Sequence, residues 1–345
     1  MKELLKLQMK LVPELLTVLD MRYNILSNIY YNQPIGRRML SNNLNLSERI
    51  IRSEVNFLKE QNLIDINSIG MSITDEGKDL LRDLKFFIRE IKGFKSIELE
   101  IANLLHIKGM VMVPGDVEED KSVLREISKI SSEYIKNLLE DNIIISLTGG
   151  NTVKEVVDSF QATNEYKDIM VLPARGGMGT DIELQSNTLA GRLASKINGR
   201  YEILHIPDSL SKETVDAILN EPEIKRIFEG IKKSTIVIHG IGDATRMSHK
   251  RELNYEIIKK IKSEDAVGEA YGHYFNADGK IVYSLPNIGI NGNEISKIKH
   301  MIAVAAGKRK ARAIIAAIKD RKNEVLFTDE ATAKEIYNIL TETSL

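Results

Sequence analysis

The sequence predicts an α/β protein built from an N-terminal winged helix-turn-helix domain and a C-terminal doubly wound α/β domain. Between residues 35 and 74, two helical segments are separated by a short turn and followed by a hairpin pattern. From residue 108 onward, apolar strand-like runs alternate with amphipathic helical stretches. The length of 345 residues agrees with about two domains. We place the domains at residues 1–90 and 91–345.

Composition excludes several classes of protein. With 48 basic and 49 acidic residues the formal net charge is -1, so any binding of nucleic acid must depend on a local basic patch. The absence of cysteine excludes disulfides, thiolate metal sites and a cysteine nucleophile. The N-terminal leucines are interrupted by charges such as Lys2, Glu3 and Lys6, and no apolar run approaches the roughly 20 residues that span a bilayer. We therefore expect a cytoplasmic protein that does not enter a membrane.

Three helices and a hairpin are predicted in the first domain. Asn45 and Leu46 form the turn before the third helix, and Ser47 with Glu48 is typical of a helix start. The predicted helices cover residues 14–31, 35–44 and 47–61, and the hairpin strands cover residues 63–66 and 71–74.

The helix-turn-helix order, the turn length and the trailing hairpin together favour DNA binding. Polar groups near the helix starts are the candidates for contacting base edges or phosphates, namely Arg37, Arg38, Ser47, Arg49 and Arg52. The alternative is that these side chains are the solvated faces of a small bundle or of a protein-docking module. The sequence does not decide which arginine reads a base and which holds a phosphate.

A helical linker follows the hairpin. Apolar residues recur at helical spacing over residues 74–88 and again over residues 96–105, after an interruption at Gly93. Such a segment either connects two domains rigidly or pairs with its copy in a dimer. Since a DNA reader of this class generally needs two copies for two half-sites, we expect a homodimer, with dimers of dimers on operator DNA.

The second domain alternates strands with helices. The pattern predicts a mainly parallel sheet covered on both faces, with ligands bound beyond the carboxyl ends of the strands. Predicted strands are residues 108–113, 143–147, 169–173, 201–206, 235–239, 301–305 and 324–327. Predicted helices are residues 123–139, 184–197, 212–219, 310–318 and 331–340.

The clearest site signal follows the strand at residues 143–147. A small-residue loop with Gly149 and Gly150 leads into a helix that begins near Asn151 and Thr152. Such a turn directs backbone amides, hydroxyls and the positive end of the helix dipole at one point, where a phosphate can bind. The alternative is a tight strand-to-helix turn with a threonine cap and no ligand.

Three further loops add cations. Arg175 lies in the glycine loop 174–180, Lys310 stands at a helix start in the loop 306–311, and Lys250 with Arg251 belongs to a basic loop at residues 246–251. Four such loops exceed the need of one phosphate, so we infer a doubly phosphorylated or otherwise strongly anionic small molecule. Gln185 and Glu269 could share hydrogen bonds with sugar hydroxyls; their alternatives are a helix-face amide and a surface carboxylate.

An enzyme is the rival class. Sugar-phosphate isomerases use a carboxylate base, for which Asp181, Asp243 and Glu269 are candidates. No base stands with an orienting partner at a recognisable spacing, and the HExxH, GxSxG and GxxxxGK[ST] motifs are absent. The histidines are scattered, which argues against a metal site. We therefore assign no catalytic residue, no metal and no cofactor.

The motifs together resemble one family. The winged helix-turn-helix, the run 148–152, the run 172–177 and the run 307–311 are similar to the SorC/DeoR-type bacterial transcriptional regulators over essentially the full length. The likeness is greatest to members that control glycolytic genes. It implies a repressor of the operon for the triose stage of glycolysis, induced by fructose 1,6-bisphosphate, with an effector domain similar to sugar-phosphate isomerases.

The resemblance also implies roles by position. One phosphate would be held by Gly149, Gly150, Asn151, Thr152 and Lys310, and the rest of the ligand would contact Arg175, Gln185, Lys250, Arg251 and Glu269. Asn151 departs from the family, which often has a second threonine there, although an amide can still bind phosphate. Two alternatives remain: a regulator that senses another phosphorylated sugar or sugar alcohol, and a sugar-phosphate isomerase.

Overall fold

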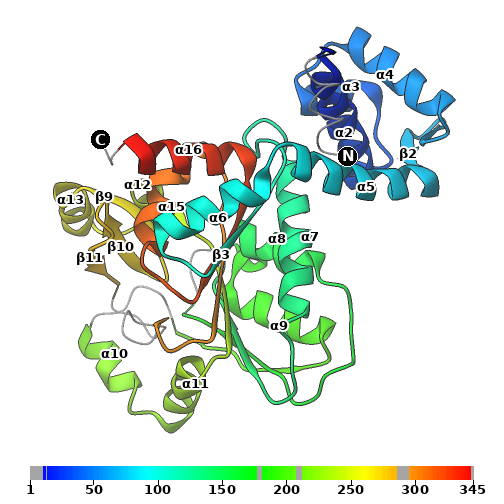
Figure 1. Ribbon diagram of the computed structural model, residues 1–345. Coiled ribbons are helices and arrows are strands. Elements are labelled where there is room, and N and C mark those ends of the chain that lie inside the picture. The colour runs from blue at the N-terminus through cyan, green and yellow to red at the C-terminus, as the bar shows by residue number, and fades with distance from the viewer. Residues whose placement is uncertain (1–10, 13, 177–180, 207–211, 286–294, 343–345) are drawn as a thin grey trace. The chain divides into compact units, whose positions relative to one another are not determined.

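The computed structural model describes residues 11–12, 14–176, 181–206, 212–285 and 295–342 (Figure 1). Its contacts divide the chain into two compact units. The N-terminal unit is Met1–Ile97 with Val113–Val123, and the C-terminal unit is Glu98–Met112 with Leu124–Leu345. The polypeptide therefore passes from one unit to the other three times, after Ile97, Met112 and Val123.

The N-terminal unit is a winged helix-turn-helix, as the sequence predicts. Its elements in order are α2 (Glu14–Asn32), α3 (Arg37–Leu44), α4 (Glu48–Glu60), β1 (Ile64–Ile66), β2 (Met71–Ile73) and α5 (Asp75–Ile91). β1 and β2 pair antiparallel, with Ile64 opposite Ile73, and form the wing. α6 (Phe94–Leu105) follows α5, so the linker is helical as expected.

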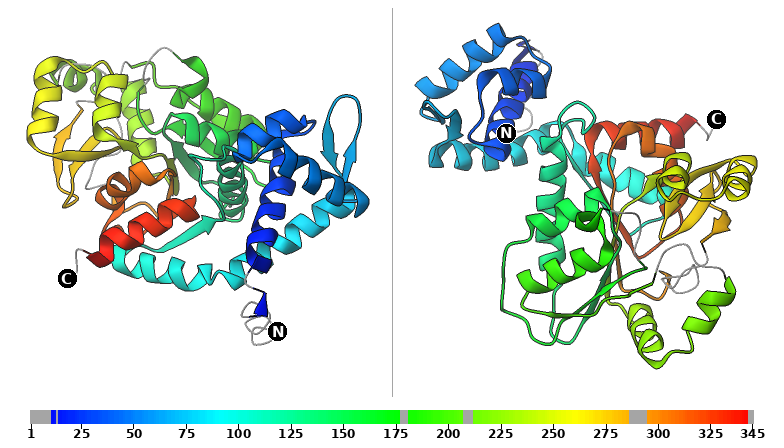
Figure 2. Two further views of the ribbon diagram at one scale, coloured as in Figure 1. Left: turned by 90° about the horizontal axis from the view of Figure 1, so that it is seen from above. Right: turned by 180° about the vertical axis from the view of Figure 1, so that it is seen from behind.

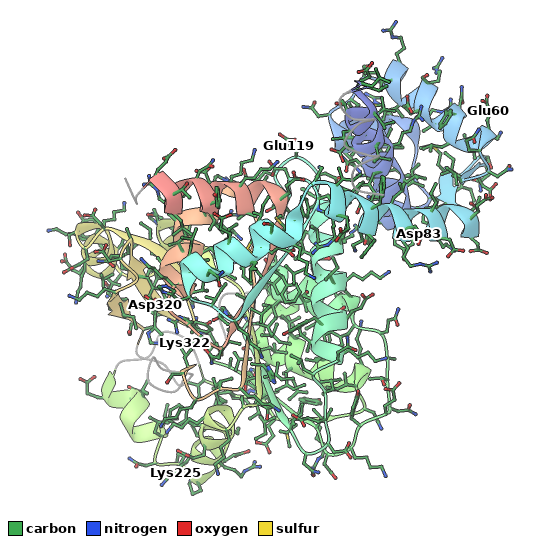
Figure 3. The ribbon with its side chains drawn as sticks, in the orientation of Figure 1. Glu60, Asp83, Glu119, Lys225, Asp320 and Lys322 are labelled. Carbon is green, nitrogen blue, oxygen red and sulfur yellow. The ribbon has the colours of Figure 1, made fainter. Side chains whose placement is uncertain are left out.

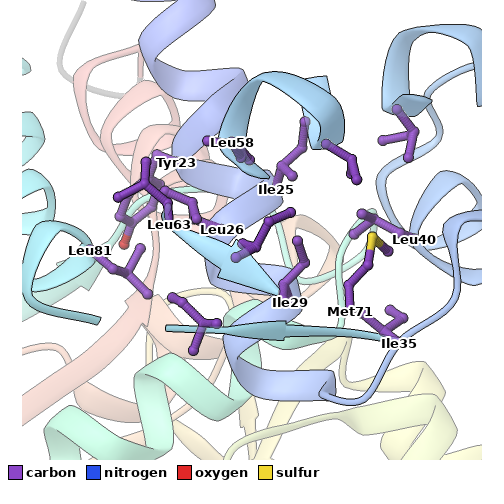
Figure 4. Packing of buried hydrophobic residues seen from close by; sticks show 14 of the residues in the cluster. Tyr23, Ile25, Leu26, Ile29, Ile35, Leu40, Leu58, Leu63, Met71 and Leu81 are labelled. Atoms are coloured by element: carbon purple, nitrogen blue, oxygen red, sulfur yellow. The ribbon is translucent and has the colours of Figure 1, made fainter. Parts of the chain in front are cut away.

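Helix periodicity explains the core of this unit. α4 buries Ile51, Val55 and Leu58, which recur at intervals of four and three residues and so share one face. They pack with Leu26 and Ile29 of α2, in the cluster of buried hydrophobic residues that Figure 4 shows. The opposite face of α4 remains available for contacts outside the unit.

One loop that follows β3 (Gly109–Val113), well beyond the winged helix-turn-helix in the sequence, belongs to the N-terminal unit. The segment Val113–Val123, marked by Glu119 in Figure 3, carries Asp120. Asn28 of α2 is fully buried, and its Nδ2 donates to Asp120 Oδ1 over 2.9 Å. Asn28 Oδ1 in turn accepts from the amides of Asn32 and Asn43, at 3.1 Å each. This network joins α2, α3 and the loop through a single buried side chain.

A seven-stranded sheet forms the centre of the C-terminal unit. The spatial order is β3-β13-β12-β7-β4-β5-β6, and the pairs from β13 to β6 are parallel. The strands are β3 (Gly109–Val113), β4 (Ile144–Leu147), β5 (Met170–Pro173), β6 (Arg200–Tyr201), β7 (Ile236–His239), β12 (His300–Val304) and β13 (Glu324–Asp329). Their nearly continuous burial is typical of parallel strands covered on both faces.

Helices cover both faces of the sheet, as Figures 1 and 2 show, with α8 and α9 on one side and α15 and α16 on the other. The longer helices are α7 (Ser122–Lys136), α8 (Asn151–Ser159), α9 (Ser186–Lys196), α11 (Pro222–Lys232), α13 (Tyr255–Ser263), α15 (Ala311–Ile318) and α16 (Glu330–Glu342). The shorter ones are α10 (Lys212–Ile218), α12 (Ala244–Lys250) and the 3-10 turns η1 (Ile182–Leu184) and η2 (Lys308–Lys310).

Two predictions about this half of the chain are wrong. The strand expected at residues 201–206 ends at Tyr201, because the Asn187 side chain bonds both backbone groups of Leu204, at 2.9 and 3.1 Å, and so draws the chain away from the sheet. The basic loop expected at residues 246–251 is mostly the helix α12, whose first turn is capped by Asp243 accepting from the Arg246 amide over 2.8 Å.

A second sheet was not predicted. It is antiparallel, in the order β11-β10-β9-β8, with strands β8 (Gly242–Asp243), β9 (Ala266–Ala270), β10 (His273–Asn276) and β11 (Ile281–Ser284). It packs on α15 at Gly268, where a Cβ atom would lie 2.8 Å from the Ala313 carbonyl oxygen. This close approach fixes β9 beside the carboxyl end of the main sheet.

The strand order reverses between β4 and β7. From β4 the chain builds outward through β5 to β6, and from β7 it builds the other way through β12 to β13. The loops after β4 and β7 therefore separate at this point, which is where ligands bind in open α/β sheets.

Candidate functional site

The loop after β4 forms a helix N-terminus without a side-chain cap. Gly150, at the N-cap of α8, has φ 116° and no described side chain bonds the first turn. The first intrahelical bond runs from Lys154 N to Gly150 O over 2.9 Å, so the amides of Asn151, Thr152 and Val153 precede it. Amides in this position, with the helix dipole behind them, suit an anion.

The same loop is held tightly from behind. The Gly150 amide donates to the Leu184 carbonyl over 2.9 Å, and a Cβ on Gly149 would lie 2.4 Å from the same oxygen. Ser186 Oγ then donates to the Arg175 carbonyl over 3.0 Å. These bonds bring the segments at residues 149–150, 175 and 184–186 together, and the binding of a ligand by Gln185 and by the other residues of these segments stays a prediction.

The loop after β7 lies on the other side of the point where the strand order reverses. The Thr148 amide donates to the Ile238 carbonyl over 3.0 Å, and the Gly240 amide is 3.4 Å from Thr148 Oγ1. Gly242 in β8 pairs with Glu269 in β9. Residues 240–242 thus join the small sheet to the loop at residues 148–150, which we call the anion loop.

A buried ion cluster lies on this sheet, formed by Arg175, Arg251 and Glu269. Arg251 Nη2 donates to Glu269 Oε1 over 2.8 Å and Arg175 Nη1 lies 3.4 Å from the same oxygen, with each side chain 5% exposed. The Gly272 amide also donates to Glu269 Oε1 over 2.8 Å. Burial alone would raise the pKa of Glu269, but the guanidinium groups of Arg251 and Arg175 outweigh it and lower the pKa below its ordinary value.

Two guanidinium groups share one carboxylate in this cluster, in surroundings where charge interactions are strong. Glu269 is therefore no surface carboxylate, and it acts as an internal counter-ion for two cations. Such a cluster can accept an anionic group of a ligand.

The loop after β12 adds a further cation. Gly307 has φ 111°, and its amide donates to the buried Thr332 hydroxyl over 2.7 Å. The Lys310 amide returns to the Gly307 carbonyl over 2.8 Å, and Lys310 forms the N-cap of α15. α15 packs against β9, the strand of Glu269, so the Lys310 backbone stands at the side of the small sheet.

The two basic residues predicted at the end of α12, Lys250 and Arg251, lie in different surroundings. Arg251 is buried in the ion cluster, whereas Lys250, the last residue of α12, is exposed and none of the contacts described for it reaches the cluster. Among the other predicted residues, Gly177, Met178, Gly179 and Thr180 of the second glycine loop lie outside the described residues.

Sequence reasoning missed a second buried polar group beside the ion cluster, formed by His239, Tyr271 and Glu324. His239 Nε2 lies 2.8 Å from Glu324 Oε1 and 2.5 Å from the Tyr271 hydroxyl, which donates to Glu324 Oε2 over 3.3 Å. Burial and the charge of Glu324 raise the pKa of Tyr271 well above its ordinary value, so the phenol stays protonated and donates. The residues are far apart in sequence, and only a Tyr-Gly turn signal at residues 271–272 could have pointed to this group.

The predicted DNA-facing side chains all lie on the outside of the N-terminal unit. Ser47 caps α4 by accepting from the Ile50 amide over 3.3 Å, and its hydroxyl hydrogen remains available as a donor. The arginines are exposed at the N-terminal ends of α3 and α4, namely Arg37, Arg38, Arg49 and Arg52. Their contact with DNA remains a prediction.

The described part of the chain holds no group of three or more His, Asp or Glu side chains that could bind a metal ion. It also holds no helix with the length and apolar character needed to cross a membrane.

Comparison with known proteins matches two consecutive regions of the chain to family models. Residues 89–338 match the model described as "Putative sugar-binding domain", and residues 18–88 match "CggR N-terminal DNA binding domain". Two similar proteins bear the name central glycolytic genes regulator. The one from Bacillus subtilis is 39% identical over 336 residues, 97% of this chain and 99% of the relative. The one from Priestia megaterium is 40% identical over 337 residues, with 97% and 98% covered.

A solved structure is similar in fold to most of this chain. It is a chain from Enterococcus faecalis whose description reads "putative SorC family transcriptional regulator". Its TM-score is 0.65 at 33% sequence identity, and the match covers 70% of this chain and 99% of that chain.

Proposed function

We propose that this chain, which belongs to the family of the central glycolytic genes regulators, is a DNA-binding repressor of genes for the triose stage of glycolysis. In this proposal fructose 1,6-bisphosphate binds the C-terminal unit and relieves repression. The protein would act in the cytoplasm as a homodimer that pairs into a dimer of dimers on operator DNA.

One observation carries the choice of ligand class. The anion loop at α8 and the buried ion cluster are joined through Ser186 and Leu184 but use different groups: backbone amides in one, guanidinium groups in the other. A sugar with two phosphates can satisfy both, with Lys310 beside the helix dipole and Gln185, Glu269 and Lys250 toward the sugar and the second phosphate. A monophosphate leaves one of them unused.

The geometry gives little support to the isomerase alternative. Asp181 caps η1 by accepting from the Glu183 amide over 3.1 Å, and Asp243 caps α12. Glu269 is held as a carboxylate by Arg175 and Arg251, which makes it a weak base. Each candidate base is thus engaged in a structural contact.

The proposed mechanism is linkage between the two ligands. If the sugar bisphosphate binds better to a conformation or assembly that holds operator DNA poorly, each ligand lowers the affinity for the other by the same factor. A coupling of about 1–3 kcal/mol gives a roughly 5- to 150-fold change in DNA affinity.

The test is fluorescence anisotropy of the protein on DNA from upstream of its own operon, at one fixed salt concentration. We expect fructose 1,6-bisphosphate to weaken specific binding and fructose 6-phosphate to leave it unchanged. Arg175→Ala should abolish this response, whereas Arg200→Ala, which removes an exposed arginine paired with Asp168, should retain it. A response to a different phosphosugar would overturn the assigned ligand, and turnover of aldose and ketose phosphates would favour the isomerase.

A further inference from the structure

The hairpin that carries Glu269 has an unusual turn. β9 and β10 are joined by two residues, Tyr271 and Gly272, with Ala270 opposite His273. Both turn residues have positive φ, 55° and 86°. This is the geometry of the two-residue hairpin turns that asparagine and glycine usually form, and a tyrosine there must be secured by its side chain.

The side chain of Tyr271 is secured on the main sheet. Its ring lies 4.2 Å from the ring of His239, centroid to centroid, and its hydroxyl lies between His239 Nε2 and Glu324 Oε2, at 2.5 and 3.3 Å. Tyr271 is 4% exposed, and His239 and Glu324 are fully buried. His239 ends β7 and Glu324 begins β13, so the tip of the hairpin is attached to two strands of the large sheet.

Each end of this attachment is next to a ligand-site group. Glu269 lies two residues before Tyr271, and its Oε1 accepts from the amide of Gly272, the other turn residue. His239 immediately precedes Gly240, whose amide is 3.4 Å from Thr148 Oγ1 in the anion loop. A shift of the turn would therefore move the Glu269 carboxylate relative to Arg175 and Arg251.

We propose that Tyr271 is a positioning residue of the ligand site: its buried hydroxyl, anchored on His239 and Glu324, fixes the turn that aims the Glu269 carboxylate at Arg175 and Arg251. The ligand part of this inference rests on the function proposed above. The geometric part concerns the turn alone and can be tested without any ligand.

The first measurement is hydrogen-deuterium exchange of the ligand-free protein, followed on peptides that cover residues 268–276. Tyr271→Phe keeps the ring and removes the hydroxyl. We expect amide exchange in the turn to become about 10-fold faster, and exchange elsewhere in the C-terminal unit to change less than about 2-fold. The matched control is Tyr283→Phe, which removes a hydroxyl from β11 of the same sheet, outside this group, and should leave the turn unchanged.

The second measurement is a double-mutant cycle on the affinity for fructose 1,6-bisphosphate. Tyr271→Phe should weaken binding about 5-fold in the natural sequence but less than about 2-fold beside Glu269→Asp, which already displaces the carboxylate. Equal losses in both backgrounds would mean that Tyr271 only supports the fold, and would overturn the positioning role.

The outcomes separate the two proposals. If the natural protein does not bind fructose 1,6-bisphosphate but Tyr271→Phe speeds exchange at the turn alone, the proposed ligand fails and the positioning inference stands. If exchange at the turn is unchanged, or rises uniformly across the unit, the inference is overturned whatever the ligand does. Should Tyr271→Phe not fold, His239→Phe keeps an aromatic ring and removes the nitrogen that lies 2.5 Å from the phenol, and the same local increase in exchange is expected.

Discussion

The Arg251 guanidinium donates to the Glu269 carboxylate over 2.8 Å at a place where both side chains are 5% exposed. Arg175 Nη1 lies 3.4 Å from the same oxygen. Two arginines from distant loops are thus kept in place by one acidic residue before any ligand arrives. In the proposed function the cations would need little rearrangement to bind a phosphate, which would reduce the cost of binding.

Removing the Glu269 carboxylate should lower the stability of the fold. Glu269→Gln removes the carboxylate that two buried guanidinium groups share, so the free energy of unfolding should fall by about 3–5 kcal/mol at neutral pH, with partial recovery in inorganic phosphate. Urea unfolding followed by circular dichroism measures this loss. Glu183→Gln, which breaks the exposed pair with Arg192, should cost about 0–1 kcal/mol. Equal losses in the two variants would contradict the assigned role of Glu269.

The same carboxylate predicts a pH dependence. Burial opposes its charge, but Arg251 and Arg175 lower the pKa of Glu269 below its ordinary value of 4.5. A group whose pKa is lower in the folded state stabilises the fold above the unfolded pKa and loses that effect as pH falls through the folded pKa. The stability difference between the natural protein and Glu269→Gln should be constant above about pH 5.5 and shrink below about pH 4.5. A difference that grows with acidity would refute this.

Gly149 should tolerate no side chain. A Cβ there would lie 2.4 Å from the Leu184 carbonyl oxygen, so Gly149→Ala must displace the anion loop. We expect a loss of about 1–3 kcal/mol in stability and loss of the response of DNA binding to the sugar bisphosphate. Gly109→Ala is the control, because a Cβ at Gly109 meets nothing within 4 Å. A fully responsive Gly149→Ala protein would remove this loop from the site.

Arg52 should contribute to DNA affinity and to little else. It is exposed on α4, so Arg52→Ala should leave sugar binding and stability unchanged while weakening operator binding about 3- to 10-fold at 0.1 M salt. If Arg52 holds a phosphate, the slope of log affinity against log salt should also fall by about one. Arg82→Ala is the control, since Arg82 is exposed on α5 in an ion pair with Asp79. Equal effects of the two substitutions would indicate a general loss of charge.

The buried Asn28 offers a test of the loop at residues 113–123. Asn28→Asp replaces the amide that donates to Asp120 with a carboxylate, so two acidic groups face each other in a buried place. The N-terminal unit should lose about 1–3 kcal/mol of stability. Adding Asp120→Asn restores a donor opposite the new carboxylate and should recover most of the loss in a thermal melt. No recovery would mean that the loop is held by other contacts.

Local signals predicted the elements well. Ser47 marked the start of α4 because a serine side chain can accept from the third following amide, and the structure has that bond to Ile50. Gly149 and Gly150 marked the turn between β4 and α8, where one has no room for a Cβ and the other has positive φ. These features depend on neighbours in sequence, so the sequence contains them.

The antiparallel sheet was missed although one local signal was present. Asp278-Gly279, between the apolar runs of β10 and β11, is typical of a hairpin turn. The burial of Glu269 could not be predicted in the same way. Its partners Arg175 and Arg251 come from other segments of the chain: α12, whose C-cap residue is Arg251, packs against β9, and Arg175 follows β5. The same holds for Tyr271, His239 and Glu324.

The three crossings of the chain between its units bear on proteolysis. A cut between α5 and α6 severs the first crossing only, and the segment Val113–Val123, held at Asp120 by Asn28, still belongs to the N-terminal unit. A single nick at the linker therefore should not release a DNA-binding fragment under native conditions. A fragment that ends at residue 97 would also lack Asp120, leaving the buried amide of Asn28 without that acceptor, so it would be less stable than the same helices in the whole protein.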